Sequence, residues 1–190
     1  MTAVRARRMN RVEYERLVEI GFFRPDERLE LVGGVLVVRE PQGSRHATGI
    51  RRVETVLRRV FGSGWDVRSQ LPVALDDESE PEPDVAVVPG TYDDYRDAHP
   101  TRPALIVEVA DSGLPFARID KASLYARARV PDYWLANLVE DVLEVFRQPE
   151  RSEAAPYGWM YGDSSRLGRA EFVTPLALPA ARIAVADLLP

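Results

Sequence analysis

The fold of this chain is constrained most by two short apolar segments, DVAVV at residues 84–88 and ALIVEVA at residues 104–110. Continuous apolar runs of this length are typical of strands buried on both faces, inside a sheet that helices cover. Each segment contains one acidic residue, Asp84 in the first and Glu108 in the second. Because an unpaired carboxylate is costly to bury, each must reach solvent at an edge, pair with a cation or bind a metal ion.

Three other segments have the apolar spacing of amphipathic helices. Residues 10–20 begin with Asn10 and carry Glu13 three positions later, which is the pattern of a capping box. Residues 44–61 and 116–128 give the second and third helices. Together with the apolar strands they predict an α/β fold.

The rest of the chain is interpreted as strands separated by turns. The segment LELVGGVLVV, residues 29–38, predicts a hairpin because the Gly33-Gly34 pair suits a two-residue turn. Further strands are predicted at residues 65–75, 132–138 and 142–147, the last two joined by a tight turn at Glu140-Asp141. We expect residues 150–181 to be rich in loops with some short strands, and residues 181–190 to end in a strand or a helical turn.

The composition is that of an ordinary globular protein. The 190 residues are 45% apolar and 29% charged, which suits a single domain over residues 1–190. Cysteine is absent, so disulfides and thiol nucleophiles are excluded. No apolar run approaches the roughly 18 residues of a membrane helix, and the basic segment at residues 1–11 lacks the apolar core of a signal peptide. We therefore expect a cytoplasmic protein that does not enter the membrane.

The charge pattern allows a local basic surface but not a broad one. The formal net charge is −5, whereas proteins that hold nucleic acid over a wide face are usually basic. Arg51 and Arg52 recur seven positions later as Arg58 and Arg59, so all four share a side of the helix at residues 44–61. That side is either a solvated face or a face that contacts phosphates.

Acidic residues in apolar strands suggest a metal site. If the strands of Asp84 and Glu108 are neighbours, their carboxylates can converge on a hard cation such as Mg²⁺ or Mn²⁺. Glu30, in the hairpin, is a third acid of this kind. Lys121, the only lysine in the chain, lies on the helix after the Glu108 strand and could stabilise an anionic transition state. For each residue taken alone, a surface role or an ion pair is the favoured explanation; it is the pair of Asp84 and Glu108, and the uniqueness of Lys121, that shift the balance toward a site.

Other polar residues are weaker candidates. Gln70 could orient a nucleophile or be an ordinary strand residue, and His46 could contact a phosphate or cap its helix. His99, in a Pro-rich loop, is expected to be structural. The chain has no GxGxxG, P-loop, GxSxG or HExxH motif, so neither an organic cofactor nor a zinc protease site is predicted.

Six blocks of sequence resemble the Uma2 family, also called DUF820, of restriction-endonuclease-like proteins. The blocks are, in order, ERLELVGGVLVV, SRHATGIRRVETVL, SQLPVAL, EPDVAVV, LIVEVADS and DKASLYARARVPDYWLANL. The resemblance is strongest over residues 10–147, and the ending RIAVADLLP also fits.

The resemblance implies a PD-(D/E)xK nuclease fold, with a mixed central sheet flanked by helices. It places metal ligands on Asp84 and Glu108, with Glu30 as a further acid and Lys121 on the following helix. Two segments depart from the family pattern. The turn after Glu108 reads ADSGLPFARIDK, and Arg129 stands where a helix-capping glycine is expected, at a cost of about 1 kcal/mol.

These observations lead to one main hypothesis and two alternatives. The main hypothesis is a Mg²⁺- or Mn²⁺-dependent endonuclease that hydrolyses DNA, with Asp84, Glu108, Lys121 and Glu30 as catalytic residues. Gln70, His46, Arg51 and Arg52 would bind the substrate. The first alternative is a non-catalytic module that binds nucleic acid or protein. The second is a structural homodimer in which DYWLANL and VLEVF pair across a two-fold axis; a homodimer is also expected for the enzyme.

Overall fold

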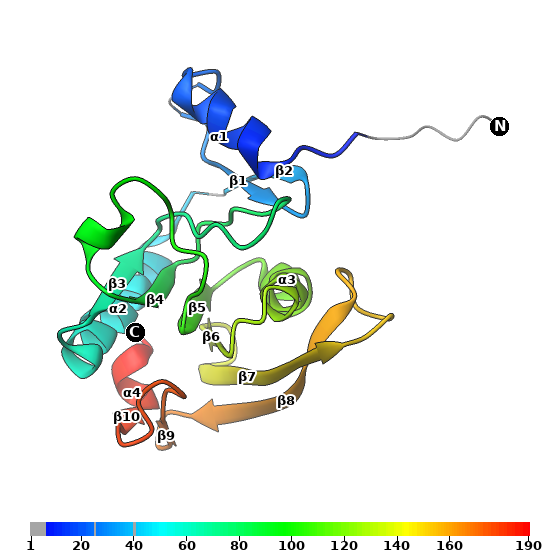
Figure 1. Cartoon of the computed structure of the whole chain (residues 1–190). Helices are drawn as coiled ribbons and strands as arrows, with labels where there is room; N and C mark the ends of the chain where they lie inside the picture. Colours follow the sequence, from blue (N-terminus) through cyan, green and yellow to red (C-terminus); the bar gives the residue numbers. More distant parts are fainter. Residues whose placement is uncertain (1–6, 25, 40) are drawn as a thin grey trace.

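A six-stranded mixed sheet forms the centre of the described part of the chain (Figure 1). The computed structural model describes residues 7–24, 26–39 and 41–190, so residues 1–6 of the basic N-terminal segment lie outside the described residues. The strands of this sheet are β3 (Trp65–Ser69), β4 (Val85–Pro89), β5 (Leu105–Ala110), β6 (Asp132–Asn137), β7 (Val142–Arg151) and β8 (Trp159–Gly168). They lie side by side in chain order; β5 and β6 are parallel and the other neighbours are antiparallel. The mixed central sheet expected from the sequence is confirmed.

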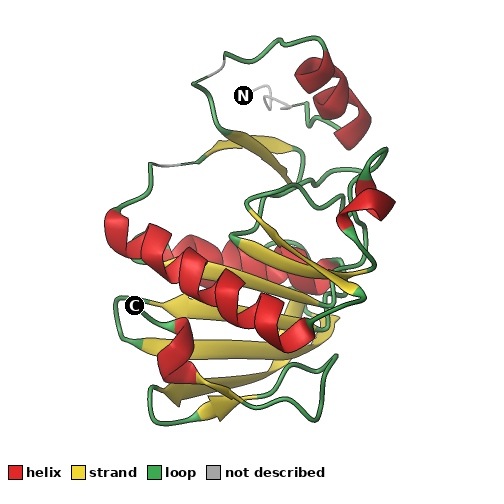
Figure 2. Ribbon diagram, turned by 90° about the vertical axis from the view of Figure 1, so that its left-hand side faces the viewer, coloured by secondary structure: helices red, strands yellow, loops and turns green. Residues whose placement is uncertain are grey.

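Helices cover both faces of the sheet. The helices of the described residues are α1 (Arg11–Glu19), α2 (Ser44–Phe61), α3 (Ala122–Arg127) and α4 (Val185–Leu188). A 3-10 turn, η1 (Tyr92–Tyr95), and a π-helical stretch, η2 (Phe116–Lys121), that leads into α3 are also present. Helices α2 and α4 pack on one face, and η2 with α3 packs on the other. Figure 2 shows α2 lying along the sheet. Among the described residues, no helix combines the length and the apolar character needed to cross a membrane.

Helix α2 forms where the sequence predicts it because its apolar residues return to one side. Ile50, Val53, Leu57 and Phe61 are buried against the sheet, three or four positions apart. Burying a side chain of this kind stabilises the fold by about 1.5–3 kcal/mol. The opposite side carries the four arginines, which are all exposed.

The N-terminal elements lie together at one end of the molecule (Figure 1). Strands β1 (Leu29–Val32) and β2 (Val35–Val38) form the predicted hairpin, and α1 has the predicted capping box between Asn10 and Glu13. Tyr14 attaches α1 to the hairpin, since it is buried and its hydroxyl donates to the Leu29 carbonyl at 2.8 Å. The Leu31 and Glu80 backbones pair, which links the hairpin to the loop before β4.

The alternation of side chains along β5 decides which face carries the acids. Val107 and Val109 belong to the apolar core under α2, whereas Ile106 and Ala110 belong to the core under α3. Glu108 lies between Ile106 and Ala110 and therefore points to the α3 side.

Three expectations about strands and helices need correction. The predicted strand at 65–75 ends at Ser69, because Gln70 adopts a positive φ of 54° and turns the chain. The tail has more regular structure than expected: β7 continues to Arg151 and pairs with the ten-residue β8, while β9 (Phe172–Val173) and β10 (Ile183–Ala184) form a small second hairpin. The predicted helix at 116–128 begins as the π-helical η2.

The proposed pairing of DYWLANL with VLEVF across a two-fold axis is wrong. These segments are β6 and β7, and each already has a hydrogen-bonded neighbour on both sides. Neither has a free edge for a second copy. The departure at Arg129 is confirmed as a left-handed position, with φ of 58°, directly after the last turn of α3.

Candidate active site

Strand register brings the two predicted metal ligands together. Val85 of β4 pairs with Val107 of β5, and one more step along both strands sets Asp84 opposite Glu108. Opposed residues of an antiparallel pair point to the same face, about 4.5–5.5 Å apart at Cβ, and like charges there are destabilising. Asp84 and Glu108 are only 3% and 5% exposed, so compensation must come from neighbouring groups rather than from water.

Lys121 provides one compensating charge. It ends η2, and its buried ammonium lies 3.0 Å from Glu108 Oε1 and 3.1 Å from Glu30 Oε1. Glu30, 2% exposed, also accepts from the Glu82 backbone amide at 2.9 Å. Tyr125, one turn after Lys121, donates its hydroxyl to Glu108 Oε1 at 2.5 Å. The helix after β5 therefore brings the Lys121 amine back to the acids, as the resemblance to the family implies.

Asp84 is held by a different set of groups. Its Oδ2 accepts from the Val109 backbone amide at 2.9 Å, which ties it to β5. Arg39, just after β2, donates to Asp84 Oδ1 at 3.3 Å and to Glu82 at 2.7 Å. His46 Nε2 lies 3.2 Å from Asp84 Oδ2, within ion-pair distance, although its angle is not that of a hydrogen bond.

Burial and neighbouring charges shift the pKa values of these groups. Burial, together with Asp84 and Glu30, raises the pKa of Glu108 against the opposing effect of Lys121. Burial also opposes the charged form of Asp84, but His46, the Val109 amide and Lys121 outweigh it and lower the pKa of that carboxyl. For Lys121 the attraction of Glu108, Glu30 and Asp84 outweighs burial and raises the pKa, so the ammonium stays charged. Its role is therefore that of a charge and a donor, not a base.

The histidine of the site is biased toward its charged form. Burial lowers the pKa of His46, but Asp84 and Asp111, which lies 3.4 Å from its Nδ1, outweigh burial and raise it. His46 lies in the first turn of α2, so its imidazole faces Asp84 and Asp111 from the start of that helix.

These side chains line a cavity of about 240 Å³. The contact network around it contains five carboxylates: Glu30, Glu82, Asp84, Glu108 and Asp111. Arg39 and Lys121 are its permanent cations, with His46 as a titratable third. The excess of negative charge favours an additional cation in the cavity.

The donor set fits a divalent ion that keeps much of its water. Within the described ranges no group of three acidic or histidine side chains is arranged to enclose a metal. Mg²⁺, however, is usually held by one or two carboxylates, with water and substrate phosphate filling the remaining positions. Asp84 and Glu108 suit such a site; Arg39 must leave Asp84 Oδ1 for that oxygen to become a ligand.

Three predicted substrate-binding residues lie outside the cavity lining. Gln70 donates its backbone amide to the carbonyls of Pro83 and Asp84, so it shapes the approach to β4 through its main chain. Its side-chain nitrogen is buried and has no hydrogen-bond partner among the described residues. Arg51 and Arg52 are exposed on α2, beyond His46.

Two residues that contact the acids of the site were not predicted from the sequence. Tyr125 lies four positions after Lys121 on a predicted helix, and this spacing could have identified it as a neighbour. Arg39 follows directly after the predicted hairpin, but only the fold reveals that this end of β2 meets Asp84.

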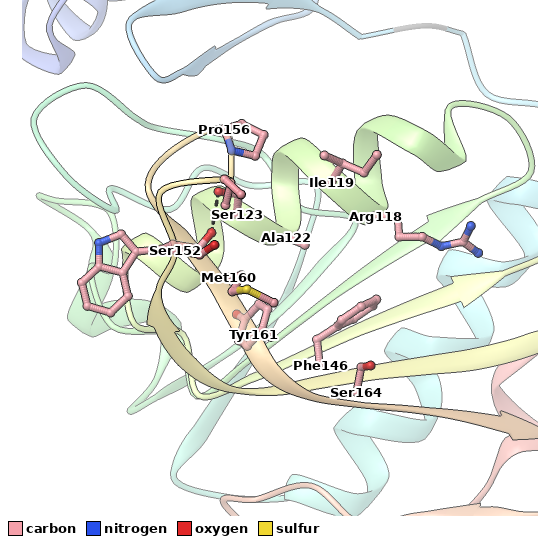
Figure 3. A pocket seen from close by; sticks show the side chains of 13 residues that line it. Arg118, Ile119, Ala122, Ser123, Phe146, Ser152, Pro156, Met160, Tyr161 and Ser164 are labelled. Atoms are coloured by element: carbon pink, nitrogen blue, oxygen red, sulfur yellow. Dashed lines mark hydrogen bonds between the residues drawn. The ribbon is translucent and has the colours of Figure 1, made fainter.

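A larger cavity of about 370 Å³ lies elsewhere, between the η2–α3 helix and strands β7 and β8 (Figure 3). Ile119, Phe146 and Met160 are among its lining residues, and none of the described residues that line it is acidic. Arg118, at its rim, already bonds to Glu144 at 2.9 Å. This cavity therefore lacks the oxygen ligands that a hard cation needs.

Comparisons with known proteins agree with this architecture. The sequence model of the Uma2 family, described as "Putative restriction endonuclease", matches residues 11–186. A crystal structure of "a putative nuclease belonging to DUF820" from Anabaena variabilis ATCC 29413 superposes with a TM-score of 0.71 at 13% identity, over 95% of this chain and 97% of that one. At this identity the likeness shows the fold. No curated protein matches the sequence.

Proposed function

This chain belongs to the Uma2 family of restriction-endonuclease-like proteins, and on that premise we propose that it is a divalent-metal-dependent endonuclease that hydrolyses DNA phosphodiester bonds. One observation carries the proposal: three buried carboxylates and a buried ammonium, from four separate segments, meet at one cavity. Buried charges of this kind are expensive to maintain and are concentrated at functional sites.

Asp84 and Glu108 are the proposed holders of Mg²⁺ or Mn²⁺. When bound there, the ion would polarise the scissile phosphate and lower the pKa of an attacking water. The Val109 amide fixes the Asp84 carboxylate by donating to its Oδ2, and the Tyr125 hydroxyl fixes Glu108 by donating to its Oε1. Both acids are thus oriented before a substrate arrives, which limits the reorganisation needed during reaction.

Lys121 is the proposed electrostatic stabiliser. Its ammonium is charged and close to Glu108, so it can donate a hydrogen bond to an oxygen of the phosphate as negative charge develops there. Glu30 holds this ammonium in place from its other side. We therefore assign Glu30 to positioning Lys121, in addition to its part in the acidic cluster.

The start of α2 supplies a surface for the DNA backbone. This helix has 18 residues and no acidic side chain in its first turn, so its amide groups and dipole favour an anion near His46. Arg51 and Arg52 follow about one turn later, exposed and able to meet a neighbouring phosphate. These contacts are local, as expected for a chain with a net charge of −5.

Supercoiled plasmid provides the test. With Mg²⁺ or Mn²⁺ the protein is expected to convert it to nicked or linear forms, and EDTA is expected to stop the reaction. Asp84→Asn, Glu108→Gln and Lys121→Met should each abolish cutting, while Glu153→Gln should not. Glu153 is an exposed residue that forms no ion pair with any other residue described in the structure. Undiminished cutting by the Glu108→Gln protein would remove the proposed mechanism.

One observation favours the alternative of a non-catalytic binding module. Lys121 already fills the space between Glu30 and Glu108, and the described residues lack a three-ligand metal group. A scaffold of this kind would bind DNA or protein without needing Mg²⁺. Calorimetric titration with Mn²⁺ separates the two, since only the enzyme requires a metal site. The homodimer remains a prediction, to be measured by light scattering.

A further inference from the structure

A second cavity, distinct from the acidic site, lies between α1 and the loops around β4. Its volume is about 510 Å³, within the usual range of small-molecule sites. The walls come from α1, from the segment between residues 72 and 82, and from the turn at residues 95–101. Among the described residues that line it there is no Asp84, Glu108 or Lys121.

Glu80 lies in its wall and is poorly compensated. The side chain is 3% exposed, and its buried Oε2 has no hydrogen-bond partner among the described residues. The nearest cations are Arg11, whose guanidinium lies 4.0 Å from Oε2, and His99, whose Nε2 lies 3.9 Å from Oε1. Arg11 is already bonded to Glu15. Buried carboxylate oxygens normally accept a hydrogen bond, and the described residues around Glu80 supply no donor for Oε2.

The other charged groups of the cavity do not supply this donor. The lining carboxylates are Glu15, Glu19, Glu80, Glu82 and Asp97, and the lining arginines are Arg11 and Arg96. Burial and the nearby Arg68 lower the pKa of His99, so the ring is mostly neutral at pH 7. The cavity is therefore negative overall and attracts a cation.

Without a ligand, a proton can partly compensate Glu80 near neutral pH. Burial, together with the nearby carboxylate of Glu15, raises the pKa of Glu80 to about 7. Because Glu80 can take up a proton near neutral pH, a positively charged hydrogen-bond donor on a ligand could take the place of that proton.

We propose that this cavity binds a small organic cation, with a guanidinium or primary ammonium group at Glu80 and an aliphatic chain along the apolar wall. The wall consists of Val18, Pro72, Ala74 and Ala98. Guanidinium and ammonium groups carry several N–H donors, which suits a carboxylate with an unpartnered oxygen. Glu19 and Asp97 lie in the same lining and suit a second positive charge on the ligand. Over the described residues no three-ligand metal group occurs here, so an organic cation fits better than a metal ion.

Agmatine and putrescine are the probes, titrated calorimetrically at pH 8 in the presence of EDTA. Both have a four-carbon chain with two cationic ends, and they differ in whether one head is guanidinium or ammonium. One site per chain is expected. Glu80→Gln, which keeps the size of the side chain, should weaken binding by about tenfold or more. The matched variant Glu153→Gln should bind as the wild type does.

A second arm needs only the wild-type protein. Binding should weaken as the pH falls from 8 to 6, because protonation of Glu80 competes with the ligand. The groups that face Glu80 are Arg11, Tyr14 and Glu15 from α1, Glu82 from its own segment and His99 from the turn. 1,4-Butanediol, which has the same chain without charge, should not bind. The proposal is overturned if neither cation binds at pH 8, if Glu80→Gln leaves affinity unchanged, or if the diol binds equally well.

Discussion

Lys121 and Glu30, 91 positions apart in the chain, form a buried ion pair with 3.1 Å between Nζ and Oε1. This pair joins the N-terminal hairpin to the helix that follows β5, and Glu108 lies on the other side of the same ammonium at 3.0 Å. One side chain thus connects the hairpin, the sheet and the helix at the site.

Lys121→Met should destabilise the fold by roughly 3–5 kcal/mol at pH 8, because it leaves two buried carboxylates without their cation. The loss should be smaller at pH 5, since the raised pKa of Glu108 allows that carboxyl to take up a proton instead. Urea unfolding at both pH values measures the difference. Arg52→Met, on the exposed side of α2, is the control and should change stability by less than about 0.5 kcal/mol. Equal losses at the two pH values would contradict this account of the pair.

Arg39→Met should increase the affinity for Mn²⁺ by roughly three- to tenfold. The change frees Asp84 Oδ1 from a contact of 3.3 Å and removes a positive charge from the edge of the cation site. Calorimetric titration in the absence of DNA gives the affinity directly. Arg169→Met removes an arginine that pairs with Asp141, away from this cavity, and should leave the affinity unchanged. Weaker Mn²⁺ binding by the Arg39 variant would show that the arginine supports the ion rather than competing with it.

Tyr125→Phe should cost about 1–3 kcal/mol, because Glu108 loses a buried hydrogen-bond donor. Removal of this donor from the charged carboxylate should also raise the pKa of Glu108 further. Thermal unfolding and an NMR titration of the Glu108 carboxyl carbon report the two effects separately. A variant with wild-type stability and an unchanged titration would show that the hydroxyl contributes nothing to the acid.

Glu80→Gln should alter the pH dependence of stability. The folded-state pKa of about 7 exceeds the value of 4.5 expected when unfolded, so the folded protein binds the extra proton between these values. The contribution of Glu80 to the free energy of unfolding is therefore present at low pH and falls as the pH rises from 4.5 to 7. The glutamine variant should gain stability relative to wild type from pH 5 to pH 8. A pH-independent difference would mean that Glu80 titrates normally.

The acidic cluster could be predicted because burying a charge inside an apolar strand costs free energy, so an acid there indicates a cation partner or a functional site. Asp84 and Glu108 stood out for this reason, and the uniqueness of Lys121 marked the cation that the fold places beside them. Local signals also sufficed for α1, where Asn10 and Glu13 form their capping box, and for the hairpin at residues 29–38.

Features set by tertiary contacts could not be predicted from local sequence. Strand β8 is mostly exposed and includes the polar run GDSSR, so it lacks the alternation that marks a strand and forms by pairing with β7. Gln70 follows an ordinary strand pattern, yet its amide bonds to Pro83 and Asp84 and the chain turns there. Arg39 reaches Asp84 only because the hairpin pairs with the loop before β4.

The central claim is that Asp84 and Glu108 together hold a divalent cation. It is tested most directly by an anomalous difference map from crystals of this protein soaked in Mn²⁺. The account predicts a peak within coordination distance of both carboxylates, about 2.0–2.3 Å from an oxygen of each, with Lys121 beside it and Arg39 withdrawn from Asp84. A map with no peak at this cavity, and with Arg39 and Lys121 still bonded to the acids, would contradict it.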